Sequence, residues 1–327
     1  MKILFQTNNI LPVKTYGGTE RIIFWLMKHL KELGHHPVLI GHPDSNVSDF
    51  GIEHIPYDPK LSEDWESLIP EDIDLIHLSY NYTFRKKEFP TLFTVHGNGQ
   101  VGEKFPLNSV FVSRKHASNH GSDAFVYNGI DFDEHPLTYT SRTESNWNNF
   151  LFLAKASWRI KNLKSCLKAC KTAKKNLHIV GGKSWLPSRY VKNYGFQGGE
   201  AKNKIIQQTD ALLFPVKWEE PFGLAIIESM GFGLPVVGSR YGSLPELINT
   251  DSGIICQNEQ ELMNVVKDCP QSFHSSKIVE YARSNFSSLE MTKNYIQMYN
   301  KVLQKNLINT KAPEWIHSNK ATSGLPF

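Results

Sequence analysis

Short runs of consecutive apolar residues recur along the first half of the chain, separated by segments of helical periodicity. The runs are KILFQT at 2–7, PVLIG at 37–41, DLIHLSY at 74–80, TLFTVHG at 91–97, SVFVS at 109–113 and AFVYNGI at 124–130. Continuous apolarity indicates strands that are buried on both faces, as in parallel sheets. Residues 19–33 place Ile22, Leu26 and Leu30 on one face and stop at Gly34, which predicts a helix between the first two strands.

The same alternation restarts near residue 150. Strands are expected at FLFLAKA (150–156), NLHIVGG (176–182), ALLFPV (211–216) and PVVGS (235–239), with helices over 163–173 and 223–231. Two such units in tandem predict an α/β protein with two Rossmann-like doubly wound domains, whose ligand crevices face each other across a cleft.

A polar, aperiodic stretch around residues 132–149 marks the connection between the two units. We therefore expect an N-terminal domain at 1–135, a linker at 136–149 and a second domain at 150–288. A C-terminal helix and tail follow at 289–327, with packing back onto the first domain as one option. The 327 residues suffice for two cores of ordinary size.

No apolar run reaches the length of a membrane span, and MKILFQTNN is too short for a secretion signal, so a cytoplasmic protein is expected. The four cysteines are too few and too unevenly placed for a disulfide framework. Peripheral contact with the inner face of a membrane stays open as a weak hypothesis. Its basis is Arg85, Lys86 and Lys87, which lie between Phe84 and Phe89.

Charge is divided unevenly along the chain. Residues 1–149 carry 13 basic and 19 acidic side chains, and residues 150–327 carry 23 basic and 13 acidic ones. A basic second half suits an anionic ligand such as a diphosphate. The lysines are scattered along amphipathic segments without interleaved aromatics, which argues against nucleic acid as a partner. The simpler alternative is that they solvate helix faces.

Two glycine pairs fall where predicted strands end and helices are expected to begin, Gly17 and Gly18 in YGGTE and Gly181 and Gly182 in IVGG. A glycine pair before a helix lets the backbone approach a phosphate or sugar at the helix N-terminus. The alternative, of equal weight, is that they only make turns. Neither pair extends to G-x-G-x-x-G, which disfavours a nicotinamide dehydrogenase.

The most informative segment, residues 216–246, reads VKWEEPFGLAIIESMGFGLPVVGSRYGSLPE. Glu220 precedes a predicted helix and Glu228 lies within it, far enough apart to touch different parts of one elongated ligand. The free N–H groups of the first helical turn lie between them. As a purely structural alternative, Glu220 would only complement the helix dipole and Glu228 would be a solvated helix residue.

This segment resembles the Glu-x7-Glu donor-binding signature of retaining GT-B glycosyltransferases, which build lipopolysaccharide, capsule and glycolipids from nucleotide sugars. The resemblance runs along nearly the whole chain, through GGTE, IHLS, TVHG, VSRKHAS, YNGID, IVGG and EEPFGLAIIE. It implies a hexosyltransferase with a nucleotide-sugar donor of UDP or GDP type and a glycan or glycolipid acceptor.

Carried over to this sequence, the resemblance assigns Glu220 to the donor sugar hydroxyls and Glu228 to the ribose. It further implies a set of other donor contacts: the backbone at Phe222, Gly223 and Leu224, the loop at Gly17 and Gly18, and, more loosely, Gly198 near the base. His96, at the end of its strand, would approach the donor sugar at the reacting centre; a simple turn residue is the alternative.

The sequence departs from the family at the basic clamp. Gly-Arg and Lys-Gly are usual there, whereas this chain has Ala154 with Lys155 and Lys161 with Asn162. Lysine keeps the charge but loses the planar fork with which arginine holds a diphosphate. Lys161 is the firmer candidate and Arg159 an alternative to Lys155, while a charged surface loop would account for all three without any function.

The resemblance implies retention of configuration without a carboxylate nucleophile, so catalysis depends on stabilising charge on the leaving diphosphate. No cofactor and no metal are expected. Asp72 and Asp74 begin a strand at the wrong end of the sheet, and Asp131 and Asp133 fall at the expected linker. Two alternatives stay open: an epimerase or hydrolase on the same fold, and a noncatalytic nucleotide-sugar-binding protein.

Overall fold

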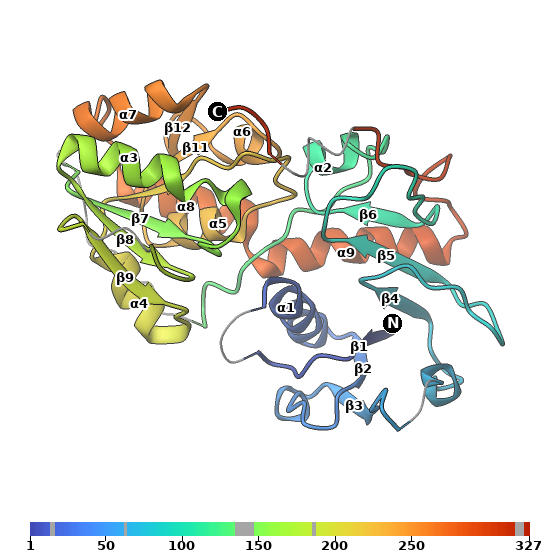
Figure 1. The fold of residues 1–327 in the computed structure, drawn as a ribbon. Coiled ribbons are helices and arrows are strands. Elements are labelled where there is room, and N and C mark those ends of the chain that lie inside the picture. The colour runs from blue at the N-terminus through green and yellow to red at the C-terminus, as the bar shows by residue number, and fades with distance from the viewer. Residues whose placement is uncertain (14–16, 62–63, 135–146, 185–187, 318–323) are drawn as a thin grey trace. The chain divides into compact units, whose positions relative to one another are not determined.

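The computed structural model describes residues 1–13, 17–61, 64–134, 147–184, 188–317 and 324–327. Within these ranges the chain forms two compact units (Figure 1). Unit 1 contains residues 1–13, 17–131 and 288–316, and unit 2 contains the described residues of 132–287 and 317–327. Most of the expected linker, residues 136–146, lies outside the described residues. The rest of it leads into unit 2, where Trp147 is buried.

Unit 1 is built on a six-stranded parallel sheet in the order β3-β2-β1-β4-β5-β6. Its strands are β1 (Lys2–Thr7), β2 (His36–Gly41), β3 (Glu53–Pro56), β4 (Leu75–Leu78), β5 (Thr91–Val95) and β6 (Ser109–Phe111). Its helices are α1 (Gly18–Glu32), α2 (Arg114–Ser118) and α9 (Ser288–Leu303), with short 3-10 turns at Ser48–Phe50 and Trp65–Leu68. The central strands are buried along their length, as their continuous apolarity predicts.

The structure joins α9 to this unit although it is distant in sequence. Helix α9 contacts α1 and β5, and its Tyr299 hydroxyl lies 2.7 Å from Nδ1 of His77 on β4. His77 is buried, and its Nε2 is 2.7 Å from the Thr94 hydroxyl on β5. A polar side chain in a core needs such partners, and here they tie the last long helix to the central strands.

One expected strand of unit 1 is absent and one observed strand was not expected. Residues 124–130 do not form a continuous strand, because only single bridges occur there, at Phe125, which pairs with Phe111, and at Ile130. The strand β3 escaped detection because it is a short edge strand whose sequence, EHIP, is only partly apolar and partly buried. The remaining five expected strands and the helix at 19–33 are confirmed within a few residues of their ends.

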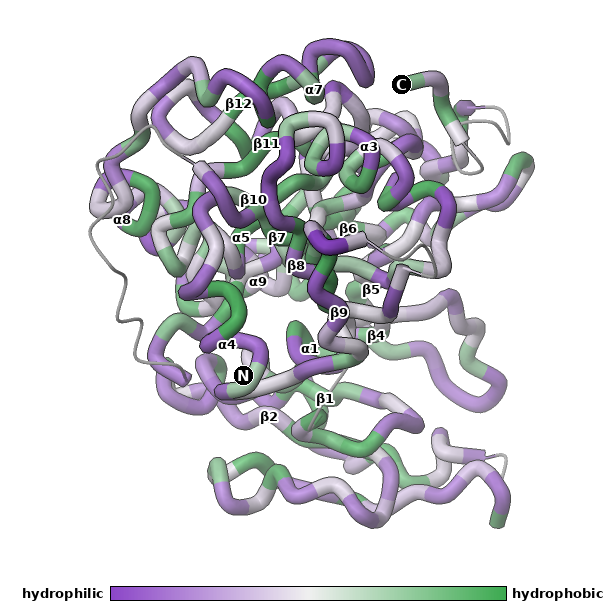
Figure 2. The backbone as a smooth tube through the Cα atoms, turned by 60° about the vertical axis from the view of Figure 1, so that its left-hand side comes forward, coloured by the Kyte–Doolittle hydropathy of each residue, from purple (hydrophilic) through white to green (hydrophobic). Residues whose placement is uncertain are grey.

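Unit 2 repeats the topology, with a parallel sheet in the order β12-β11-β10-β7-β8-β9. Its strands are β7 (Asn149–Leu153), β8 (Asn176–Val180), β9 (Val191–Gly195), β10 (Ala211–Phe214), β11 (Val236–Ser239) and β12 (Gly253–Cys256). Its helices are α3 (Leu163–Ala173), α4 (Gly199–Gln207), α5 (Leu224–Gly231), α6 (Leu244–Leu247), α7 (Glu259–Asp268) and α8 (Ser275–Phe286), with a 3-10 turn at Arg159–Lys161. In Figure 2, hydrophobic stretches follow the central strands and hydrophilic stretches the outer helices and loops.

The expectation that a helix follows the second glycine pair is wrong. After β8, Gly181 and Gly182 lead towards strand β9, which sequence patterning missed because VKNYG is mostly polar and lies at the sheet edge. Gly181 has φ +105°, and a Cβ there would lie 2.2 Å from the carbonyl oxygen of Ala154. This glycine therefore permits a close approach of two backbone segments.

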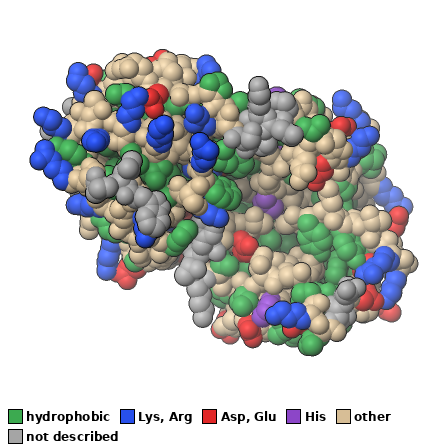
Figure 3. Space-filling view, viewed as in Figure 1, with side chains coloured by type: hydrophobic (Ala, Val, Ile, Leu, Met, Phe, Trp, Pro, Cys, Tyr) green, Lys and Arg blue, Asp and Glu red, His purple; other side chains and the backbone are tan. Residues whose placement is uncertain are grey.

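Basic side chains gather over the part of unit 2 around α3 in the space-filling view (Figure 3). Helix α3 explains part of this, because the sequence LKSCLKACKTA buries Leu163, Cys166 and Cys170 and turns its lysines outward. Among the described residues, no helix combines the length and apolarity that crossing a bilayer requires.

Candidate functional site

Each sheet has one place where the chain reverses its direction of winding, and there the loops leaving two neighbouring strands diverge. In unit 1 this switch point lies between β1 and β4, and in unit 2 between β7 and β10. Ligands of open α/β sheets bind outside the carboxyl ends of the strands at such points. The residues that follow these four strands are therefore the ones to inspect.

In unit 2 a lysine and a glutamate bridge the switch point. Lys161, on the loop after β7, places its Nζ 2.5 Å from Oε2 of Glu220, on the loop after β10. The two side chains are only 11% and 8% exposed, so both charges are largely removed from water. Trp218 donates its indole N–H to the same carboxylate oxygen at 2.7 Å, and the Lys161 ammonium lies 4.8 Å from the centre of the Trp218 ring. A buried charge pair is tolerable only with such additional partners.

Backbone contacts hold the two loops together. The amide of Lys217 donates to the carbonyl of Ile160 at 2.7 Å, and the Asn162 side chain donates to the carbonyl of Pro215 at 2.9 Å. Asn162 has φ +59°, a left-handed conformation that asparagine adopts more readily than most residues. The Lys-Asn dipeptide, where the related family has Lys-Gly, therefore still makes the turn that presents Lys161.

A third segment fixes the backbone of Glu220. Gly242 has φ +60°, and a Cβ at this position would lie 2.1 Å from the Glu220 nitrogen and 2.3 Å from its carbonyl oxygen. Its own amide donates to a carboxylate oxygen of Glu219 at 3.0 Å, and the amide of Ser243 donates to the carbonyl of Glu220 at 2.9 Å. Only glycine fits this contact, and no motif or spacing distinguishes Gly242 from the other glycines of the chain.

Helix α5 begins directly after this loop. Gly223 is its N-cap with φ +91° and provides no side-chain cap, so a ligand can occupy the place of one at the first-turn amides. Phe222 has a buried side chain, and its carbonyl accepts from the Ser243 hydroxyl at 2.7 Å. Any contact of Phe222 with a ligand would therefore come from its backbone. Leu224 is the first helical residue and is half-buried.

Glu228 is neither solvated nor alone. It is half-buried on α5, and its Oε1 accepts from Nζ of Lys202 on α4 at 2.7 Å. The Lys202 side chain is only 7% exposed. The structural alternative of a solvated helix residue is therefore wrong, and Lys202 joins the candidates. Sequence reasoning missed Lys202 because nothing in GEAKNKIIQ distinguishes it from neighbouring surface lysines.

The other basic candidates of unit 2 are placed differently. Lys155 follows β7 and is half-buried, with its ammonium 5.0 Å from the centre of the Trp158 ring. Arg159 is exposed on the 3-10 turn. Gly198 caps the N-terminus of α4 without a side-chain hydrogen bond. The structure thus brings Lys161 to Glu220, while Lys155 and Arg159 stay on the outer part of the same loop.

The last described residues return to this region. Leu325 donates its amide to the carbonyl of Lys217 at 2.6 Å, and the Tyr241 hydroxyl donates to the carbonyl of Pro326. Lys217 and Tyr241 flank the loops that carry Glu220 and Gly242. Periodicity could not reveal this contact, because a short polar tail carries no pattern.

At the switch point of unit 1 the hydrogen bond that bridges the two strands is neutral, although the Glu20 carboxylate of α1 accepts from the Asn9 side chain after β1 at 2.9 Å. Tyr80, after β4, donates its hydroxyl to the amide oxygen of Gln6 on β1. His96 follows β5, and its Nε2 lies 3.3 Å from the hydroxyl of Ser79. Its Nδ1 is buried and has no hydrogen-bond partner in the described part of the chain. Burial lowers the pKa of His96 to about 4, so the ring is neutral at physiological pH.

The first glycine pair opens helix α1. Gly17 is its N-cap and Gly18 its first residue, and no side chain caps the amides of the first turn. A Cβ on Gly17 would meet the Glu20 carboxylate at 2.8 Å. Residues 14–16, which complete the expected loop, lie outside the described residues. The placement fits an approach of the backbone to a ligand and, equally, a plain turn.

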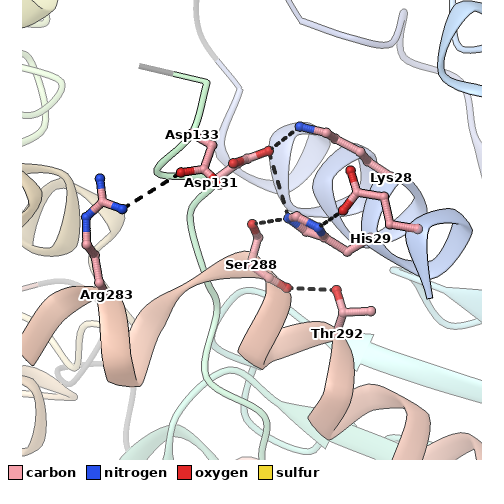
Figure 4. Close-up of polar contacts among 8 residues, drawn as sticks. Lys28, His29, Asp131, Asp133, Arg283, Ser288 and Thr292 are labelled. Atoms are coloured by element: carbon pink, nitrogen blue, oxygen red, sulfur yellow. Dashed lines mark hydrogen bonds and ion pairs between the residues drawn. The ribbon is translucent and has the colours of Figure 1, made fainter. Parts of the chain in front are cut away.

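Both Asp-x-Asp strings are engaged in ion pairs. Asp72 pairs with Lys2 at 2.8 Å, and Asp74 accepts from the Lys2 amide, both before β4 starts. Asp131 is buried and pairs with Lys28 at 2.6 Å (Figure 4). Asp133 lies 3.8 Å from Arg283. In the described portions of the chain, no three His, Cys, Asp or Glu side chains group as metal ligands would.

The basic segment Arg85–Lys87, between β4 and β5, also makes contacts within unit 1. Glu66 is buried and accepts hydrogen bonds from the amides of Arg85 and Lys86, at 3.1 and 3.2 Å. Lys86 pairs with Asp64, and Lys87 lies 5.0 Å from the centre of the Phe89 ring. The three basic side chains are nevertheless exposed.

Comparison of the sequence with known proteins gives a family match that falls mostly in unit 2. Residues 141–270 match the family described as "Glycosyl transferases group 1". A putative colanic acid biosynthesis glycosyl transferase of Escherichia coli, WcaC, is 25% identical over 130 residues, which are 38% of this chain and 32% of the relative. The chain spans less than half the length of the curated relatives it matches.

Solved structures agree over almost the whole chain. AviGT4, a glycosyltransferase of avilamycin A biosynthesis, has a TM-score of 0.75 at 20% identity, covering 96% of this chain and 99% of its own. Anabaena HepE, solved with UDP and glucose, has a TM-score of 0.67 at 17% identity, covering 92% and 100%. The chain therefore has the fold of the GT-B glycosyltransferases, and its second unit carries the match to the group 1 glycosyl transferases.

Proposed function

We propose that this protein is a retaining hexosyltransferase. It would take a sugar from a nucleotide-diphosphate donor of UDP or GDP type and place it on a hydroxyl of a glycan or glycolipid. The observation that carries this proposal is the buried Lys161–Glu220 pair at the switch point of unit 2, inside the stretch that matches the group 1 glycosyl transferases. WcaC is named for colanic acid biosynthesis and HepE was solved with UDP, which supports surface polysaccharide as the product and a nucleotide sugar as the donor.

Different residues of unit 2 bind different parts of the donor. Lys161 and the first-turn amides of α5 face the diphosphate and stabilise the charge that grows on it as the glycosidic bond breaks. Glu220 accepts hydrogen bonds from sugar hydroxyls and so orients the anomeric carbon. Glu228, held by Lys202 at 2.7 Å, accepts from the ribose. Lys155 and Arg159 add positive charge at the entrance, in place of the arginine that is usual in related enzymes.

Glu220 is a positioning group in this proposal. Its carboxylate oxygen is already engaged by Lys161 and Trp218, which favours a fixed orientation over attack on carbon. Retention then proceeds on one face of the sugar. The bond between the anomeric carbon and the diphosphate breaks while the hydroxyl oxygen of the acceptor bonds to the anomeric carbon, and the departing phosphate oxygen takes the proton of that hydroxyl. His96, whose ring is neutral and whose buried Nδ1 has no partner among the described residues, contributes a hydrogen bond at the reacting centre.

We further propose that no metal takes part. The four aspartates of the Asp-x-Asp strings are used in ion pairs and backbone contacts. Added EDTA should therefore leave transfer within about twofold of the untreated rate, since no divalent ion is needed to neutralise the diphosphate. Loss of transfer with EDTA, restored by magnesium or manganese, would contradict this. The protein is expected in the cytoplasm, with peripheral membrane contact through Arg85–Lys87 and no nucleic-acid partner.

The test is a screen of UDP, GDP, ADP, CMP and their sugars for thermal stabilisation. A true donor nucleotide at a hundred times its Kd stabilises the native state by about 2.7 kcal/mol. The stabilising nucleotide sugar is then incubated with glycan acceptors, and the anomeric configuration of the product is read by NMR. Release of free sugar or an epimer without acceptor would favour the alternative enzymes, and binding without any turnover would favour a noncatalytic protein.

A further inference from the structure

The four residues after β5, His96 to Gly99, form a loop whose conformation sets where the His96 ring lies. Gly97 is exposed and Gly99 is buried. Glycines on both sides of Asn98 would leave such a loop with many accessible conformations. Something outside the loop must therefore select one.

His116 holds the near end of the loop. This residue of α2 is buried, and its Nε2 donates to the carbonyl oxygen of Gly97 at 3.0 Å. Its Nδ1 accepts from the amide of Val112 at 3.4 Å. Because one nitrogen must donate to a carbonyl and the other accept from an amide, the ring is held in one neutral tautomer. Burial lowers the pKa of His116 well below its usual value, in agreement with a neutral ring.

His120 holds the far end. It is fully buried, its Nδ1 donates to the carbonyl of His116 at 2.8 Å, and its Nε2 accepts from the amide of Gly99 at 3.0 Å. A Cβ on Gly99 would lie 3.1 Å from this same Nε2 and 3.0 Å from the Phe105 ring. The absence of a side chain at Gly99 is what lets the loop approach the imidazole this closely.

The surroundings argue against a role in packing alone. The His120 ring stacks on Phe111, with 4.5 Å between ring centres, and lies 5.0 Å from Trp315. In such an aromatic cluster a phenylalanine or leucine would fill the volume without needing polar partners. Instead, two histidines use all four ring nitrogens in hydrogen bonds, and two of these bonds reach the backbone on either side of Asn98.

We propose that His116 and His120 are positioning residues that fix the His96–Gly99 loop and thereby the imidazole of His96. The inference rests on the proposed function, because it assigns them to transfer through His96. It predicts that they affect turnover while leaving donor binding, which belongs to unit 2, unchanged. Neither side chain touches substrate in this proposal.

The test compares paired substitutions in the full chain. His116→Leu and His120→Leu remove the hydrogen bonds, whereas His116→Gln keeps a donor and His120→Gln keeps an acceptor at nearly the same place. We expect each leucine variant to lower kcat about 30-fold, because a small displacement of a reacting group lowers the rate steeply. The KM for the nucleotide sugar should stay within about twofold of the wild-type value. Each glutamine variant should recover most of that loss.

His77→Leu is the matched control. His77 is a buried histidine of the same unit with two hydrogen bonds, to Tyr299 and Thr94, and neither bond reaches the loop. We expect it to lower the melting temperature as much as the leucine variants while keeping kcat within threefold. Leucine variants with normal kcat, or a kcat loss equal to theirs in His77→Leu, would overturn the proposal.

A second readout does not depend on transfer. The imidazole resonances of His96, assigned by their disappearance in His96→Gln, should shift or broaden in both leucine variants and stay in place in His77→Leu. Unmoved His96 resonances in variants that fold would overturn the positioning role. If the resonances respond but the wild-type protein transfers no sugar, the proposed function fails and the positioning of the ring stands. If a leucine variant does not fold, His116→Gln and His120→Gln are measured instead. The positioning role then requires that the His96 resonances keep their wild-type positions in these two variants.

Discussion

The two units share one topology and differ in the chemistry at the same place. Both have six parallel strands wound in the same order about a switch point. In unit 1 the bridge across it is a neutral hydrogen bond between Tyr80 and Gln6, and in unit 2 it is the charged pair of Lys161 and Glu220. The fold thus fixes where a ligand can bind, and the side chains beyond the strand ends decide which kind.

The difference suits the two halves of a transfer reaction. A charged pair with low exposure has a lysine ready for a diphosphate and a carboxylate ready for hydroxyls, so an anionic donor finds partners of both kinds. Neutral amide, hydroxyl and imidazole groups suit a sugar acceptor, which carries hydroxyls without strong charge. The two switch points should also differ in how much stability a substitution removes. Removing one partner of a buried ion pair leaves an uncompensated charge, whereas removing a neutral partner does not.

Replacing Lys161 should have the largest effect. Lys161→Met leaves the Glu220 carboxylate without its cation, so we expect unfolding free energy to fall by about 3 kcal/mol. Transfer should fall about a thousandfold, since the leaving diphosphate loses its main stabilising charge. Unfolding in urea and steady-state transfer are the measurements.

Two companion variants sharpen this comparison. The double change Lys161→Met with Glu220→Gln should recover most of the stability and none of the activity. Tyr80→Phe, its neutral counterpart in unit 1, should cost only about 1 kcal/mol. Equal losses for Lys161→Met and Tyr80→Phe would remove the distinction between the two switch points.

Gly242→Ala should come next. Its Cβ would collide with the Glu220 backbone, and φ +60° is strained for alanine. We expect transfer to fall about a hundredfold as Glu220 is displaced. The matched control is Gly34→Ala in unit 1, where φ is +81° and nothing lies within 4 Å, so only about 1 kcal/mol of backbone strain is expected. Activity preserved in Gly242→Ala would show that the position of Glu220 is not critical.

Sequence patterning found the central strands and the edge strand β6, and it missed the other three edge strands of the two described sheets, β3, β9 and β12. The helix at 163–173 coincides with α3, and KILFQT coincides with β1. The strands β3 and β9 lie at sheet edges with polar sequences, so their hydrogen bonds, which sequence does not display, decide their conformation. The bridge at Phe125 shows the reverse error, an apolar run buried without becoming a strand.

For the site, sequence motifs named residues but not their partners. Glu220 and Lys161 were each expected from the resemblance, yet nothing in the spacing of 59 positions indicates that they touch. Lys202 and Gly242 carried no motif at all. Their importance arises from contacts between segments far apart in the chain, the kind of information that a single sequence does not contain.

Acid should destabilise unit 1 more than unit 2. Burial lowers the pKa of His77 to about 3 and of His96 to about 4, and His116 is shifted likewise. Among the described residues of unit 2, burial lowers the pKa of one histidine in this way, that of His178, to about 4. Unfolded histidines titrate near 6.5, so below that pH the unfolded state binds more protons and stability falls.

At pH 5 each fully buried histidine should remove up to about 2 kcal/mol, and above pH 7 the effect should vanish. Hydrogen exchange measured by unit at pH 7 and pH 5, corrected for the intrinsic rate, compares the two. A larger loss of protection in unit 2 would contradict the assignment of the neutral histidines.

The most direct test of the donor site is calorimetric binding of the free nucleotide and of the intact nucleotide sugar to Glu220→Gln and Glu228→Gln. Glu228→Gln should weaken both ligands by about 1.5 to 3 kcal/mol, the worth of one charge-assisted hydrogen bond. Glu220→Gln should leave the bare nucleotide unaffected and lower turnover, because the sugar is misplaced. If Glu220→Gln abolished nucleotide binding while Glu228→Gln left it untouched, the order of contacts along the donor would be reversed.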